Sequence, residues 1–182
     1  MSPTGQRTGI ERTVLHHGRR FDFEIVRETV AGAEPIVREV VRHPGAVVVL
    51  AITEDNQIAL IRNWRIALED WVWELPAGTM EPPEPAERCA ARELEEEVGL
   101  RAARVTPIAE FFTTPGMTDE RMHAFLATGL THVGQRLEYD ERIEIHMTPV
   151  QEAFAMIDDG RLMDAKSVLT ILLALRTGAL PG

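Results

Sequence analysis

The chain has 182 residues and 45% apolar residues, which suffices for the core of one globular domain and excludes a predominantly disordered chain. Acidic residues outnumber basic ones by 29 to 19, and a net charge of -10 disfavours nucleic acid and anionic lipid as partners. The single cysteine, Cys89, excludes an intrachain disulfide framework and fits a reducing compartment. No apolar run reaches the ~20 residues of a membrane helix, and the N-terminus lacks an apolar leader, so we expect a cytoplasmic protein.

Two segments near the N-terminus predict a β-hairpin. The first dozen residues are polar and are expected to fray. Apolar and polar residues alternate over residues 19–28, and residues 36–42 form the returning strand after a turn that contains glycine and proline. We expect residues 1–43 to form an arm and residues 44–182 to form the main domain.

The main domain is predicted to combine strands and helices. The β-branched run at 46–53 predicts a strand buried on both faces, and a helix at 86–98 follows Pro85 and ends at Gly99. The other expected elements are strands at 58–65, 71–78, 106–112, 121–128 and 144–148, and helices at 150–158 and 164–176. This order indicates the α/β class, with a mixed sheet between layers of helices in an α/β/α sandwich.

Three glutamates of the predicted helix share one face. At ~100° per residue, Glu97 lies ~40° to one side of Glu93 and Glu96 lies ~60° to the other side. Arg92 can pair with Glu96, but one arginine cannot neutralise three carboxylates. Mg²⁺ or Mn²⁺ would offset the repulsion, because both cations favour carboxylate oxygens. The alternative is a solvated acidic helix face.

The spacing around these glutamates favours the metal site. Residues 78–100, GTMEPPEPAERCAARELEEEVGL, resemble the Nudix box of the Nudix hydrolases, which cleave nucleoside diphosphates linked to a second moiety. The matching positions are Gly78, Glu84, Arg92, Glu93, Glu96, Glu97, Gly99 and Leu100. The resemblance implies a Nudix-type sandwich and a divalent metal, Mg²⁺ or Mn²⁺, with on the order of two or three ions.

The roles of the box residues follow from the same resemblance. Glu93, Glu96 and Glu97 match metal ligands, as does the backbone carbonyl of Ala77. Arg92 matches the residue that orients the glutamates, and Arg92 and Glu97 are counted among the catalytic residues. Glu84 is expected to be structural, because a helix would carry it to the side opposite Glu93.

Segments outside the box resemble the ADP-ribose pyrophosphatase subgroup. These are VREVVRHPGAVVVLAI, LIRNWR with WVWELPAG, and FFTTPGMTDERMHAFLA, in which Pro115 lies fifteen residues beyond Leu100. The subgroup implies a homodimer in which the N-terminal hairpin is exchanged between subunits. Residues that match substrate-binding positions are Arg38, Arg65, Pro115, Gly116 and Glu120.

A late acidic loop is expected to supply a further carboxylate. The subgroup often carries two glutamates separated by one residue, and one of them serves as base or as an extra metal ligand. Glu141 aligns with the second acid, whereas Tyr139 stands where the first would be. Glu138 or Asp140 could substitute through a shifted loop. The alternative is that these side chains are solvated loop acids.

The sequence therefore favours metal-dependent hydrolysis of ADP-ribose or another ADP-sugar, with AMP and ribose 5-phosphate formed from ADP-ribose. One alternative is a Nudix hydrolase of another nucleotide sugar or dinucleotide, such as GDP-mannose, NADH or FAD. A second is a non-catalytic module that senses a nucleotide, which the presence of every box glutamate disfavours. A purely structural acidic protein would leave the box unexplained.

Overall fold

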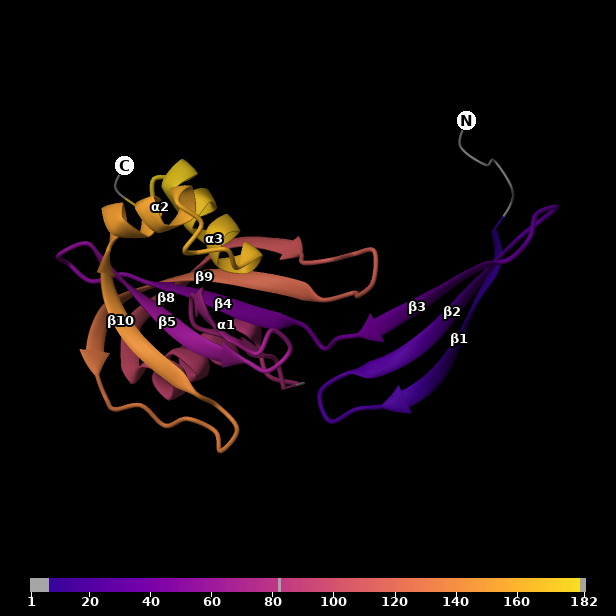
Figure 1. Ribbon diagram of the computed structural model, residues 1–182, viewed down its shortest axis with the longest axis horizontal. Helices are drawn as coiled ribbons and strands as arrows, with labels where there is room; N and C mark the ends of the chain where they lie inside the picture. The colour runs from indigo at the N-terminus through magenta and orange to yellow at the C-terminus, as the bar shows by residue number, and fades with distance from the viewer. Residues whose placement is uncertain (1–6, 82, 181–182) are drawn as a thin grey trace. The chain divides into compact units, whose positions relative to one another are not determined.

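The computed structural model describes residues 7–81 and 83–180, so residues 1–6 of the expected frayed end and Pro82 of the box lie outside the described residues. The chain divides into two compact units, drawn in Figure 1. The first comprises residues up to Gly45 together with residues 112–121, and the second comprises residues 46–111 and the rest of the chain from Met122.

The first unit contains a three-stranded antiparallel sheet in the order β1-β2-β3. The strands are β1 (Arg7–His17), β2 (Asp22–Val30) and β3 (Ile36–Arg42). The predicted strand at 36–42 is confirmed, and the strand predicted at 19–28 is found at Asp22–Val30, but the expectation that residues 7–12 fray is wrong. These residues pair along β2, and Arg12 forms an ion pair with the buried Glu24 at 3.0 Å. Tertiary pairing therefore orders a polar segment that has no apolar pattern of its own.

The second unit contains two small sheets. One has the order β7-β4-β9-β8, in which β4 is antiparallel to β7 and parallel to β9, and the other is antiparallel in the order β10-β5-β6. Their strands are β4 (Ala46–Ala51), β5 (Gln57–Arg65), β6 (Asp70–Glu74), β7 (Ala77–Thr79), β8 (Leu100–Phe112), β9 (Arg121–His132) and β10 (Ile143–Pro149). The helices are α1 (Ala86–Glu93), the π-helical η1 (Leu94–Val98), α2 (Val150–Asp158) and α3 (Ala165–Arg176).

Strand β4 is the centre of this unit and is buried throughout. Val47 on one face of β4 belongs to the same apolar cluster as Leu94 of the box segment, whereas Val48 on the other face shares a cluster with Ile171 of α3. Figure 1 shows α2 and α3 on one side of the strands and α1 on the other. The predicted α/β/α sandwich with a mixed sheet is therefore confirmed.

The box segment differs from the predicted continuous α-helix. The α-helix ends at Glu93, and Leu94–Val98 form a π-helical turn that ends at Gly99, whose φ is +69°. A Cβ at Gly99 would lie 2.5 Å from the backbone nitrogen of Gln135, so both the conformation and the space require glycine. Strand β8 also begins at Leu100, six residues earlier than predicted. In the described part of the chain, no helix combines the length and apolarity needed to cross a membrane.

Candidate active site

Two of the three box glutamates are buried where α1 passes into η1. Glu93 is the last residue of α1, and Glu97 of η1 is only 3% exposed. Glu96 lies between them along the turn and retains partial exposure. A π-helical turn is a frequent feature of functional sites, and here it carries two of the three predicted ligands. Burial of two carboxylates so close together is costly unless cations compensate them.

Arg92 provides part of this compensation. Its Nη1 atom lies 2.7 Å from Oε1 of Glu93 and donates to Oε2 of Glu96 at 2.9 Å. Its Nε and Nη2 atoms donate to Glu84 at 3.3 and 3.0 Å. Burial opposes the charge of Arg92, but the glutamates around it raise its pKa, so the guanidinium stays charged. Glu84 thus anchors the arginine that contacts Glu93 and Glu96.

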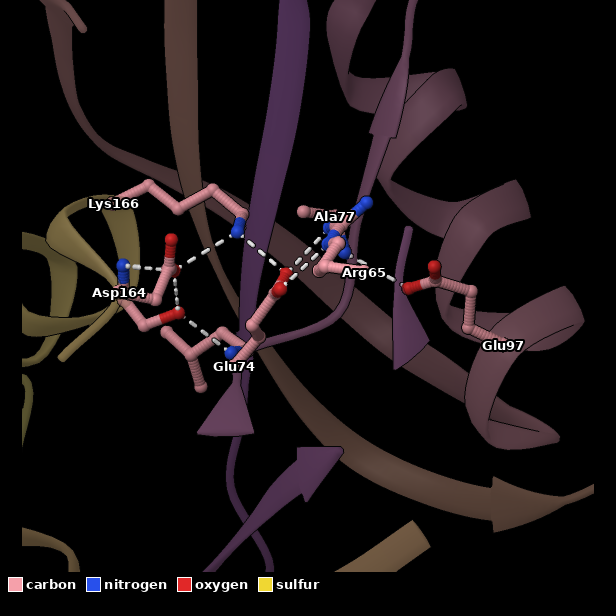
Figure 2. A network of polar contacts seen from close by, with 8 residues as sticks. Arg65, Glu74, Ala77, Glu97, Asp164 and Lys166 are labelled. Carbon is pink, nitrogen blue, oxygen red and sulfur yellow. Dashed lines mark hydrogen bonds and ion pairs between the residues drawn. The ribbon is translucent and has the colours of Figure 1, made fainter. Parts of the chain in front are cut away.

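Glu97 faces the start of β7, as Figure 2 shows. The backbone N–H of Ala77 donates to Oε2 of Glu97 at 2.9 Å. Burial raises the pKa of Glu97 well above its ordinary value, and the charges of Glu93 and Glu141 raise it further. Ala77 contacts Glu97 through its backbone N–H, and the role of its carbonyl as a metal ligand stays a prediction.

Gly78 allows β7 to approach the box helix. A Cβ built at this position would lie 1.9 Å from the carboxyl carbon of Glu93 and about as close to both carboxyl oxygens. Any larger residue would therefore displace the Glu93 carboxylate. This close approach explains why the first position of the box is a glycine.

The late loop places Glu141 within electrostatic reach of the box. Burial raises the pKa of Glu93 to about 7; Arg92 opposes this shift, and the charges of Glu96 and Glu141 add to it. Glu141 thus raises the pKa of both buried glutamates. The loop is a tight turn, in which the Glu138 N–H donates to Oε2 of Glu141 at 2.8 Å and the Glu141 N–H donates to the Glu138 carbonyl at 3.2 Å.

Arg65 at the end of β5 belongs to a network that the sequence reasoning missed. Its Nε and Nη2 atoms donate to the two carboxylate oxygens of Glu74 at 2.6 and 2.5 Å, and Nζ of Lys166 donates to Glu74 at 2.7 Å (Figure 2). Burial alone would raise the pKa of Glu74, but the two cations lower it below its ordinary value. The signal in the sequence was a glutamate inside the apolar segment WVWELP, where a buried charge requires a partner.

The remaining predicted substrate residues belong to the first unit. Arg38 is exposed on β3, and its Nη1 atom donates to the Val37 carbonyl at 2.7 Å. Pro115 and Gly116 lie in the turn after β8, and Glu120 accepts a hydrogen bond from Oγ1 of Thr113 at 2.5 Å. Their roles in substrate binding stay predictions.

The charge of the cluster fits a divalent cation. The carboxylates of the three box glutamates and of Glu141 lie close enough to repel one another. Arg92 is a cation beside them, and it divides its contacts among Glu84, Glu93 and Glu96. Within residues 7–81 and 83–180, no three acidic, histidine or cysteine side chains form a preformed cage for an ion. Arg92 occupies two of the carboxylates, so a cation would compete with this arginine. The hard oxygen donors are those that Mg²⁺ and Mn²⁺ prefer.

The chain is similar to known proteins over most of its length. The family model of the NUDIX domain matches residues 41–169. An ADP-ribose pyrophosphatase of Bacillus subtilis (strain 168) is 35% identical over 164 residues, which cover 89% of each chain. An ADP-ribose pyrophosphatase of Mycobacterium tuberculosis (strain ATCC 25618 / H37Rv) is 33% identical over 166 residues, covering 90% of this chain and 80% of the relative. The crystal structure of an ADP compounds hydrolase superposes with a TM-score of 0.78 at 21% identity, covering 94% of this chain and 92% of that chain.

Proposed function

Because this chain belongs to the Nudix family, we propose that it hydrolyses the diphosphate of ADP-ribose and related ADP-sugars, giving AMP and ribose 5-phosphate from ADP-ribose. The observation that carries the proposal is the cluster of Glu93, Glu96 and Glu97 with Arg92 beside them. The names of the two relatives, which match nine-tenths of the chain, support ADP-ribose as substrate.

The box glutamates and the Ala77 carbonyl would hold the metal, Mg²⁺ or Mn²⁺, with on the order of two or three ions, and Glu141 would be a further ligand where it does not serve as the base. When bound, such ions would lower the pKa of a water molecule and stabilise the negative charge that develops on the attacked phosphate. The charge of the buried Glu93 and Glu97, which Arg92 compensates only in part, supports this assignment.

The protein's own groups would position the substrate and move a proton. The oxygen of water forms a bond to a phosphorus of the diphosphate, the bond from that phosphorus to the bridging oxygen breaks, and the water proton passes to a carboxylate. We assign the carboxylate to Glu141, with Glu138 second, because glutamates committed to a cation are weaker bases. The side chain of Arg65 pairs with Glu74 and is still 43% exposed, so its guanidinium is free to contact the diphosphate of the substrate.

Residues of the first unit are proposed to bind the substrate. Arg38, Glu120 and the Pro115–Gly116 turn are the proposed contacts to the nucleotide and its sugar. Residues 1–43 would form an arm exchanged in a homodimer, with the Nudix domain at 44–182. The exposed apolar residues on the arm support this assembly, and the single cysteine supports a cytoplasmic location.

A substrate panel tests the proposal. The purified protein is incubated with Mg²⁺ or Mn²⁺ and with ADP-ribose, another ADP-sugar, GDP-mannose, NADH or FAD, and the products are separated by chromatography. We expect the highest kcat/KM for ADP-ribose, with equal amounts of AMP and ribose 5-phosphate. If kcat/KM is higher for GDP-mannose or a dinucleotide, that compound and not ADP-ribose is the preferred substrate. Binding of ADP-ribose without turnover would favour the sensing module instead.

A further inference from the structure

Lys166 connects the first turn of α3 to the end of β6. Its side chain is 13% exposed, and its Nζ atom donates to Oε2 of Glu74 at 2.7 Å and to Oδ2 of Asp164 at 2.9 Å. Oε2 of Glu74 is also the oxygen that receives Nη2 of Arg65. The Glu74 carboxylate is therefore held from two sides, by an arginine of β5 and by a lysine of α3.

The start of α3 is itself fixed to the same segment. Asp164 caps the helix by accepting from the N–H of Ser167 at 3.0 Å. The hydroxyl of Ser167, which is fully buried, accepts from the N–H of Leu75 at 2.7 Å. Because Leu75 follows Glu74 directly, the helix start holds both the backbone and the carboxylate at the end of β6.

Arg65 depends on this carboxylate for its orientation. Two of its three guanidinium nitrogens bind Glu74, and among the described residues no hydrogen-bond partner of Nη1 is found. The side chain is 43% exposed, and the charges of Glu97 and Asp164 also act on the guanidinium, but only Glu74 is found to accept a hydrogen bond from it within the described part of the chain. A bidentate pair fixes an arginine only as firmly as the carboxylate is fixed.

We infer that Lys166 is a positioning residue for substrate binding: it fixes Glu74, which in turn aims Arg65 at the diphosphate. The inference rests on the proposed function, in which Arg65 contacts the substrate. Lys166 itself touches neither the box glutamates nor Glu141 in the structure, and it acts through two side chains. Binding of the diphosphate, rather than the chemical step, is the property that Lys166 controls.

The test compares Lys166→Met with the wild type and with two further variants. Lys166→Arg keeps the charge and the ability to bridge two carboxylates. Arg161→Met is the matched control, because Arg161 also pairs with two carboxylates, those of Glu152 and Asp159, at the exposed connection between α2 and α3. Circular dichroism checks the fold of each variant, and Lys166→Gln replaces Lys166→Met if the latter does not fold.

Steady-state kinetics with ADP-ribose and Mg²⁺ provide the first readout. We expect Lys166→Met to raise KM by about fivefold or more while kcat stays within about twofold. An increase of this size matches the coupling usually measured between residues of one hydrogen-bond network. Lys166→Arg should recover most of the loss, and Arg161→Met should match the wild type. Added to Arg65→Lys, Lys166→Met should raise KM less than it does alone, because both changes disturb one contact.

NMR of the Arg65 Nε–H group provides a readout that needs no activity. In ¹⁵N-labelled protein, we expect this signal to shift and to exchange with water faster in Lys166→Met, but not in Arg161→Met. If the wild type does not hydrolyse ADP-ribose, the proposed function fails and the Arg65 signal alone decides the inference. An unchanged Arg65 signal overturns the inference, and so does an unchanged KM in an enzyme that hydrolyses ADP-ribose.

Discussion

Glu93 and Glu97 are carboxylates buried without enough nearby positive charge, and their ionisation opposes folding when no metal is bound. The pKa of Glu93 is raised to about 7 from an ordinary 4.5, and that of Glu97 is raised as well. The folded protein therefore binds more protons than the unfolded chain between about pH 4.5 and 7. The free energy of unfolding should fall as the pH rises through this window.

Urea denaturation in EDTA measures this dependence. We expect the wild type to lose about 1–3 kcal/mol between pH 5.5 and pH 8. Glu97→Gln should lose less, because the amide cannot ionise while its oxygen can still accept from the Ala77 N–H. At pH 8 in EDTA, Glu97→Gln should therefore be at least as stable as the wild type. If the free energy of unfolding depends on pH equally in both proteins, the ionisation of Glu97 does not destabilise the fold.

The choice of base can be tested on the late loop. Glu141 is the proposed base and lies within electrostatic reach of both buried glutamates, so Glu141→Gln should lower kcat by more than about tenfold at saturating Mg²⁺. Glu138→Gln is the matched control in the same turn and should lower kcat less. A kcat of Glu141→Gln within about threefold of the wild type, a loss under ~0.7 kcal/mol, would make Glu141 dispensable and Glu138 or a box glutamate the better base.

At the scale of elements, the site depends on how closely β7 approaches α1. Gly78→Ala should push the Glu93 carboxylate aside, because the added Cβ would lie 1.9 Å from its carboxyl carbon. We expect kcat/KM to fall by at least about tenfold and the free energy of unfolding to fall by about 1–3 kcal/mol. Activity assays and urea denaturation measure the two effects.

Gly9→Ala in β1 is the control for this substitution, because a Cβ at Gly9 would meet no atom within 4 Å. Its stability should stay within about 0.5 kcal/mol of the wild type. Wild-type kinetics for Gly78→Ala would mean that Glu93 tolerates displacement and is not a ligand.

The sequence predicted the elements whose side chains carry a pattern. The β-branched run of β4 and the end of the box helix at Gly99 were correct. Strand β1 was missed because its order comes from pairing with β2, and the π-helical turn was missed because it breaks the 3.6-residue period. The network of Glu74 and Lys166 joins residues 92 positions apart, which no local pattern reveals.

At the scale of the whole molecule, the three-stranded sheet should be a dimer arm. Several apolar side chains on it are exposed, among them Ile10, Leu15, Phe21, Phe23 and Ile36. Such side chains favour a partner surface. Light scattering at micromolar concentration should give a mass near twice 20.4 kDa. Deletion of residues 1–42 should abolish the dimer and raise KM, and a monomeric full-length chain would contradict the exchanged arm.

The box glutamates are proposed to use a divalent cation to hydrolyse ADP-ribose. Chromatography of AMP and ribose 5-phosphate tests this for the wild type and Glu97→Gln, each with Mg²⁺ and with EDTA. We predict that EDTA abolishes wild-type turnover and that restored Mg²⁺ recovers it. Glu97→Gln should be folded yet lose at least about 100-fold in kcat, beyond what supporting residues of metal sites usually cost. Full turnover in EDTA, or wild-type kcat in Glu97→Gln, would contradict the account.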